Sequence, residues 1–181
     1  MSIFIEKIME TRNNYFNSYV DINEIEKKYP LSTYSKEYLL DKIKQANTNN
    51  ENNKILFENR IKTLQCEYKS IYEKGIADEL LNSKVSAYQN ILENNKYISD
   101  LELKALCNRV IEDKDVISSR YLQDYINKAD RNVNVGALPV GAEEKIQAID
   151  SICEKSISYL HKPLEYALFE KQLEHYQTIL D

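Results

Sequence analysis

The residues best suited to metal binding or acid–base chemistry are two histidines, His161 and His175. Neither belongs to a Glu-x-x-His or His-x-x-x-His motif, the spacings of helical di-iron and zinc-protease sites. If the residues after Pro163 form one straight helix, the two rings lie about 18 Å apart along its axis. The spacing therefore predicts that they do not share a metal ion.

The candidate nucleophiles are three cysteines, Cys66, Cys107 and Cys153, each inside an apolar helical pattern. Their odd number and the absence of a Cys-x-x-Cys pair favour buried free thiols in a reducing cytoplasm over disulfides or metal ligands. Cys153 and His161 are two helical turns apart, which is too far for a direct nucleophile–base pair on one helix.

Other catalytic signatures are missing from the sequence, including Gly-x-Ser-x-Gly, the kinase motifs and the dinucleotide fingerprint. Carboxylates at helical spacing, such as Glu170 and Glu174, are typical of a solvated helix face rather than an acid–base couple. We therefore predict no catalytic residue, no cofactor and no metal. An enzyme whose site residues are dispersed along the chain is kept as the third functional alternative.

The segment "DRNVNVGALPVG", residues 130–141, differs from the rest of the chain because it holds Gly136, Pro139 and Gly141. A phosphate-binding loop is disfavoured, since Glu143 and Glu144 would occupy the first turn of the next helix and repel an anion. The segment is also apolar, unlike a solvated linker. We interpret it as a hinge loop that either packs against its own domain or presents apolar side chains to a partner.

The elements that position these residues are predicted to be helices, because strand patterns are nearly absent and apolar residues recur at intervals of three and four. Helices are expected over residues 2–19, over a short segment capped by Asp21, and over residues 34–46. The Asn-rich stretch 47–53 is interpreted as a turn, with Thr48 and Glu51 as a capping box for a helix that Gly75 ends.

Four further helices are expected toward the C-terminus. One carries Leu81 to Leu92, one opens with the Ser99–Glu102 capping box, one runs to about Ala129, and one spans residues 142–161. Pro163 suits the first turn of a last helix. The fold class is therefore all-α, an irregular bundle of eight or nine helices ending in an antiparallel hairpin. We expect one domain, with a body (1–129), the hinge loop (130–141) and an acidic hairpin (142–181).

The charge distribution bears on the kind of partner. The net charge is −5, and the second half of the chain carries all the excess acid. No basic run is longer than Lys27–Lys28, so nucleic acid is not expected as a partner. The charged N-terminal segment predicts neither a signal peptide nor a membrane span, and hence a cytoplasmic protein unless it is exported without such a signal. The Asn-, Lys-, Ile- and Tyr-rich composition would suit a phage or low-GC bacterial protein.

Four tyrosine pairs at i,i+4 spacing stand out: Tyr15/Tyr19, Tyr34/Tyr38, Tyr68/Tyr72 and Tyr121/Tyr125. Such pairs share one helix face and serve either as core edge or as a partner surface. We predict a non-enzymatic protein-binding protein, plausibly of the inhibitor or immunity type, that masks a basic site; the alternative is a structural subunit that self-assembles. The predicted partner-binding residues are Val135, Leu138, Val140, Glu143, Asp150, Glu154, Tyr121 and Tyr125.

Overall fold

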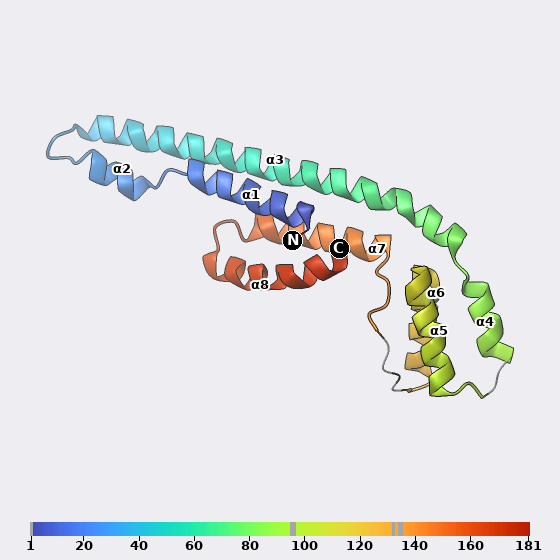
Figure 1. Ribbon diagram of the computed structural model, residues 1–181. Coiled ribbons are helices and arrows are strands. Elements are labelled where there is room, and N and C mark those ends of the chain that lie inside the picture. The colour runs from blue at the N-terminus through green and yellow to red at the C-terminus, as the bar shows by residue number, and fades with distance from the viewer. Residues whose placement is uncertain (1, 95–96, 132, 134–135) are drawn as a thin grey trace. The chain divides into compact units, whose positions relative to one another are not determined.

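The computed structural model describes residues 2–94, 97–131, 133 and 136–181, and it is 81% helical. Within these residues the chain forms eight α-helices and no strand, which confirms the all-α prediction (Figure 1). The helices are α1 (Ile3–Ser18), α2 (Ile22–Lys28), α3 (Lys36–Asn82), α4 (Val85–Asn94), α5 (Asp100–Asp113), α6 (Val116–Lys128), α7 (Ala142–Ser158) and α8 (Pro163–Leu180).

The helices form two compact units. Unit 1 comprises Met1–Tyr68 and Ala148–Asp181, and unit 2 comprises Lys69–Gln147. The boundaries between the units fall inside α3 and α7, so each of these two helices contributes residues to both units.

Unit 1 is built around α1, which lies beside the middle part of α3, with Tyr15 against Phe57 and Phe4 against Tyr68. Its core joins apolar side chains from four helices: Phe4, Ile5, Ile8, Phe57, Ile61, Leu64, Ile149, Ile152, Cys153, Tyr166, Phe169 and Leu173. Lys155 on α7 bonds Gln172 on α8, whereas Ser151, one turn earlier, bonds Tyr176, one turn later. This reversed order shows that α7 and α8 are antiparallel, as the sequence predicts, and Pro163 occupies the first turn of α8.

Unit 2 has its own core, formed by buried residues of α4, α5 and α6 together with Ile98: Tyr88, Leu92, Leu103, Cys107, Val110, Leu122 and Ile126. The predicted Ser99–Glu102 capping box is present at the start of α5. At the start of α6, Asp115 accepts hydrogen bonds from the Ser118 backbone and hydroxyl and from the Lys84 backbone N–H. Asp115 therefore fixes the N-terminus of α6 and the residue before α4 together.

Helix α3 corrects two predictions, because it continues without a break through residues 47–53 and through Gly75. Thr48 does not cap a new helix; its hydroxyl donates to the Lys44 carbonyl one turn earlier. Asn50 explains why the Asn-rich stretch is held in helical form. Its amide accepts from the Val20 N–H and donates to the Val20 carbonyl, both at 2.9 Å. Asn53 donates to the Ser18 carbonyl at the end of α1, so tertiary contacts offset the weak helix propensity of asparagine.

Candidate functional site

The apolar residues of the predicted partner surface lie in or beside the segment that precedes α7. Val135 is outside the described residues. Val140 is exposed, and Leu138 is half-buried at the edge of a shallow depression of about 470 Å³ beside Arg120 of α6. Val133, by contrast, packs against the core of unit 2. The segment therefore both contacts its own unit and exposes apolar atoms.

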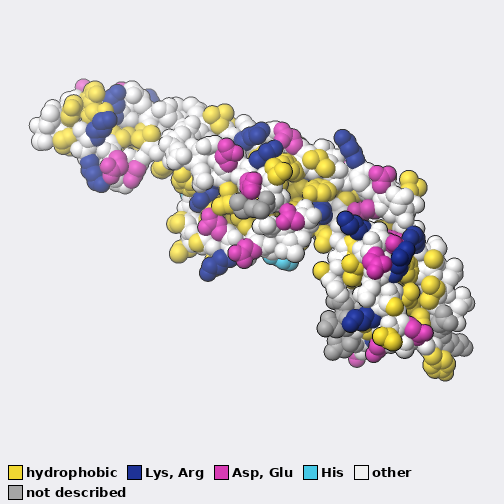
Figure 2. All heavy atoms as spheres, viewed as in Figure 1, with side chains coloured by type: hydrophobic (Ala, Val, Ile, Leu, Met, Phe, Trp, Pro, Cys, Tyr) yellow, Lys and Arg dark blue, Asp and Glu magenta, His cyan; other side chains and the backbone are white. Residues whose placement is uncertain are grey.

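The predicted acidic face on α7 is partly engaged within the chain. Glu143 lies 3.5 Å from an Arg120 guanidinium nitrogen, and Asp150 accepts a hydrogen bond from Gln65. Glu154 is exposed and forms no ion pair with a described residue. Figure 2 shows basic and acidic side chains interspersed on the visible face rather than gathered by sign.

The predicted tyrosines differ in their surroundings. Tyr121 and Tyr125 are half-buried and pack against the core of unit 2. Tyr34 and Tyr38 stack on each other at the surface, with ring centroids 5.4 Å apart and planes 17° apart. Tyr15 and Tyr19 were not among the predicted partner-binding residues, but both lie near two cavities of unit 1. Tyr15 lines the first cavity, and Tyr19 packs against His161, which lines the second.

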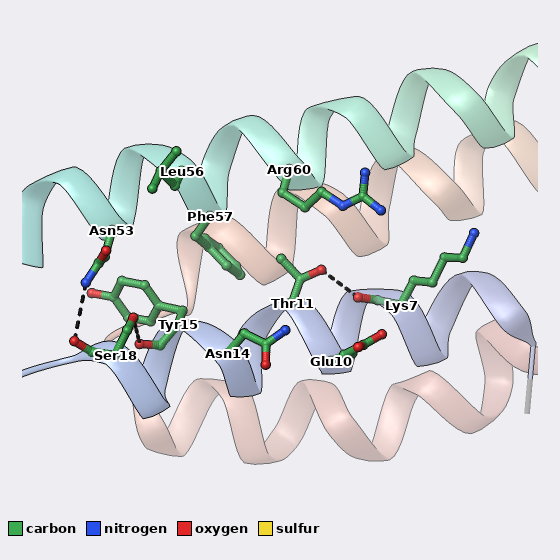
Figure 3. A pocket seen from close by; sticks show the side chains of 10 residues that line it. All are labelled: Lys7, Glu10, Thr11, Asn14, Tyr15, Ser18, Asn53, Leu56, Phe57 and Arg60. Carbon is green, nitrogen blue, oxygen red and sulfur yellow. Dashed lines mark hydrogen bonds between the residues drawn. The ribbon is translucent and has the colours of Figure 1, made fainter.

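The first of these cavities is the α1–α3 groove, a depression of about 410 Å³ between two helices of unit 1 (Figure 3). The α1 side chains recur every three to four positions, which places them on one helix face. The lining residues are Lys7, Glu10, Thr11, Asn14, Tyr15 and Ser18 from α1, and Asn53, Leu56, Phe57 and Arg60 from α3.

The groove carries two cationic side chains on opposite walls. Lys7 extends from α1 and Arg60 from α3 (Figure 3). Neither forms an ion pair with a described residue, although the Lys7 ammonium lies 5.3 Å from the centre of the Tyr68 ring. Glu10, which also lines the groove, offsets one of the two charges. The groove is therefore polar, weakly cationic and open to solvent.

Tyr15 closes one end of the groove and links it to the loop between α7 and α8. Its hydroxyl lies 2.7 Å from Nε2 of His161. Burial, together with Tyr19 and Glu51, raises the pKa of Tyr15 above its ordinary value, so the hydroxyl stays protonated at neutral pH. The His161 ring packs against three rings of α1, those of Tyr15, Phe16 and Tyr19.

The second cavity, here called the Arg12 pocket, lies beside His161 and has a volume of about 390 Å³. Its lining consists of Arg12, Asn13, Phe16, Leu160, His161 and Pro163. The Arg12 guanidinium lies 3.4 Å from the centre of the Tyr166 ring and 4.7 Å from that of Phe16. Its Nε is buried without a hydrogen-bond partner, and the side chain forms no ion pair with a described residue.

Tyr166 provides the buried floor on which Arg12 rests. Burial raises the pKa of its hydroxyl; the Arg12 charge opposes that rise and the Glu170 charge adds to it. The contacts with the Tyr166 and Phe16 rings limit the orientations available to the Arg12 side chain.

Sequence reasoning missed Arg12 and the position of His161, and it did not select Tyr15 or Tyr19. The pairing of Tyr15 with Tyr19 was visible as an i,i+4 pattern. The approach of His161 was not, because 146 positions separate it from Tyr15. The cysteine prediction also needs correction: Cys107 and Cys153 are buried, but Cys66 is exposed on α3.

The chain matches no protein-family model, no curated protein and no solved structure. Across the part of the chain that the structure describes, no three His, Cys, Asp or Glu side chains are grouped so as to hold a metal ion. No helix in this part is long and apolar enough to cross a bilayer. The candidate site is therefore the surface around α1. We call it the α1 surface, and it comprises the α1–α3 groove, the Tyr15–His161 pair and the Arg12 pocket.

Proposed function

We propose that this chain is a non-enzymatic protein-binding protein that contacts its partner through the α1 surface. The observation that supports this proposal is the exposure of aromatic rings on α1 beside the Arg12 guanidinium, which contacts the rings of Phe16 and Tyr166. Phe16 is 38% exposed and Tyr19 is 40% exposed. Aromatic side chains and arginine are enriched among the residues that dominate binding energy at protein interfaces, because each buries much area at small entropic cost.

More specifically, we propose that the chain is an inhibitor or immunity-type protein that masks a basic site on its partner. This part of the proposal depends on the acidic face of α7. It is supported by the net charge of −5 and by the exposed carboxylate of Glu154. A charge reversal, Glu154→Lys, tests it directly. If the partner presents a basic site to α7, this variant binds more weakly and the loss is larger at low salt. If Glu154→Lys binds as tightly as the wild type, the partner does not present a basic site to α7.

A second candidate function is self-assembly as a structural subunit. Two leucines one turn apart on α8 favour it, since Leu164 is 79% exposed and Leu168 is 63% exposed. Light scattering of the purified chain separates the candidates. A discrete large oligomer that Leu168→Glu dissociates would support the structural subunit, whereas a monomer supports the binding protein.

The main experiment is capture of a partner from the native host by the immobilised chain, followed by measurement of affinity with the purified partner. Phe16→Ala and Tyr19→Ala should weaken binding while leaving the melting temperature close to that of the wild type. The matched control is Tyr97→Ala, because Tyr97 is 94% exposed and belongs to unit 2. Equal affinity of the Phe16 and Tyr19 variants and the control would show that the α1 surface is not the binding site.

A further inference from the structure

We propose that the Arg12 pocket binds the C-terminal residue of a partner protein, with its carboxylate on Arg12 and an apolar side chain in the pocket. This inference rests on the proposed function and adds the chemistry of the group that is recognised. It concerns one cavity of unit 1, between the end of α1 and the α7–α8 loop.

The charge of Arg12 determines the charge of a ligand that suits this pocket. A partly buried guanidinium without a counter-ion is unfavourable, and this one has none among the described residues. Stacking on Tyr166 and Phe16 fixes its plane. A carboxylate matches the planar array of N–H donors in an arginine, and it would supply the missing charge.

His161 lines the same pocket as Arg12, and we infer that it supplies a second donor. Its Nε2 faces the Tyr15 hydroxyl, whose raised pKa keeps it protonated. When that hydroxyl donates to Nε2, the neutral imidazole carries its proton on Nδ1. Nδ1 forms no hydrogen bond with a described residue, so it is free to donate to a ligand oxygen.

The remaining lining distinguishes the kind of carboxylate. Phe16, Leu160 and Pro163 provide an apolar wall next to the two donors. A glutamate side chain brings only two methylene groups to such a wall. A C-terminal leucine brings both the carboxylate and a branched apolar side chain in one residue, and therefore fits the pocket better.

The test uses the purified full chain and the peptide N-acetyl-Gly-Gly-Leu, with its C-terminus either free or amidated. Binding is followed by NMR through the Arg12 Nε–H and His161 ring signals. We expect the free acid to shift both signals with millimolar affinity and the amide to bind at least about tenfold more weakly. Equal binding of acid and amide would overturn the inference.

Two variants test the residue assignment. Arg12→Met keeps a long apolar side chain without the charge and should abolish binding; Arg12→Lys keeps the charge without the planar donors and should weaken it. If circular dichroism shows that Arg12→Met does not fold, the affinity of Arg12→Lys is compared with that of the wild type instead. The matched control is Arg60→Met in the α1–α3 groove. Wild-type affinity in the Arg12 variants, or loss in the control alone, would contradict the proposal.

Two smaller probes identify the occupant. Acetate that binds as well as the peptide would show a general anion site. That result would overturn the proposal as stated. N-acetyl-leucine carries the same carboxylate and side chain, so we expect it to bind about as tightly as the peptide. Binding at least about tenfold weaker would contradict the assignment of both groups to the terminal residue. The failure of this inference is separable from that of the proposed function. A captured partner whose affinity is insensitive to Arg12 refutes only this inference. Peptide binding that requires Arg12, in a chain that captures no partner protein, leaves the pocket assignment standing and counts against the proposed function.

Discussion

The hydroxyl of Tyr15 lies 2.7 Å from Nε2 of His161, although 146 positions separate these residues in the chain. This contact joins the C-terminal half of α1 to the loop between α7 and α8. It also connects the two cavities, because Tyr15 lines the α1–α3 groove and His161 lines the Arg12 pocket.

The hydrogen bond should contribute measurably to stability. Tyr15→Phe removes the hydroxyl and leaves the ring, so we expect the free energy of unfolding to fall by about 1 kcal/mol. Urea denaturation measures this change. Tyr19→Phe is the matched control, because its ring also packs against His161 while its hydroxyl has no hydrogen-bond partner among the described residues. An equal effect of both substitutions would show that the Tyr15 hydroxyl contributes nothing specific.

The two glycines Gly75 and Gly141 should respond in opposite directions to alanine. An added Cβ at Gly75 meets no atom within 4 Å, and the residue lies inside α3, so Gly75→Ala should stabilise the protein by about 0.5–1 kcal/mol. At Gly141 the Cβ would lie 2.6 Å from Cγ1 of the buried Val116 and 2.8 Å from a Glu144 carboxylate oxygen. Gly141→Ala should therefore destabilise it by about 1–3 kcal/mol.

Thermal and urea unfolding of the two alanine variants measure both changes. The hinge-loop interpretation of residues 130–141 would favour an unusual backbone conformation at Gly141, but its φ is not positive, and the close approach of Val116 on α6 explains the glycine instead. Similar effects of the two substitutions would contradict this account.

Asp115 should make stability depend on acid. Burial acts to raise its pKa, but hydrogen bonds from the Lys84 N–H and from Ser118 outweigh burial and lower it. Since the folded pKa lies below the unfolded value of about 3.9, the contribution of Asp115 is fully present above that pH and is lost as the pH falls through the folded pKa.

Asp115→Asn should accordingly lower stability by about 1–3 kcal/mol at neutral pH, and the difference from the wild type should shrink below about pH 4. Urea titrations across the acid range provide the measurement, with the exposed Asp78→Asn as the control in the same unit. A difference that stays constant down to pH 2 would exclude the ionised carboxylate as its source.

The three thiols should differ in reactivity. Cys66 is exposed, whereas Cys107 and Cys153 are buried, and burial raises the pKa of Cys107. A thiol-specific chromogenic reagent should therefore modify one cysteine rapidly in the folded protein and all three after denaturation. Cys66→Ser should abolish the rapid phase. A rapid phase that persists in this variant would mean that one of the buried thiols is accessible.

The fold class was predictable because local signals agreed with tertiary structure at most helix ends. Asp21, Ser99 and Pro163 stand where the sequence placed them, since a cap or an N-terminal proline acts on its own helix. The continuity of α3 was not predictable from local signals. The Asn-rich stretch 47–53 and Gly75 indicated breaks in the helix. The contacts that stabilise the continuous helix, Asn50 with Val20 and Asn53 with Ser18, join residues 30 to 35 positions apart.

The candidate site was less accessible to sequence reasoning than the fold. Its cavities depend on which helices lie beside α1, and periodicity identifies the buried face of a helix without identifying its neighbours. The sequence left the tyrosine pairs open as core edge or partner surface, and Tyr121 and Tyr125 are half-buried against the core of unit 2. Arg12 had no role in the sequence prediction, although its position one turn before Phe16 places both on one face.

The pairing of Asn50 with Val20 has a consequence for how the region can change over evolutionary time. A connection between two helices usually tolerates insertions and deletions, because its backbone is solvated. Here the Asn50 side-chain amide bonds both the N–H and the carbonyl of Val20, as a neighbouring β-strand would. Adding or removing one residue between Ser18 and Asp21 would present a different peptide to Asn50. The connection from α1 to α2 should therefore vary in sequence while remaining constant in length.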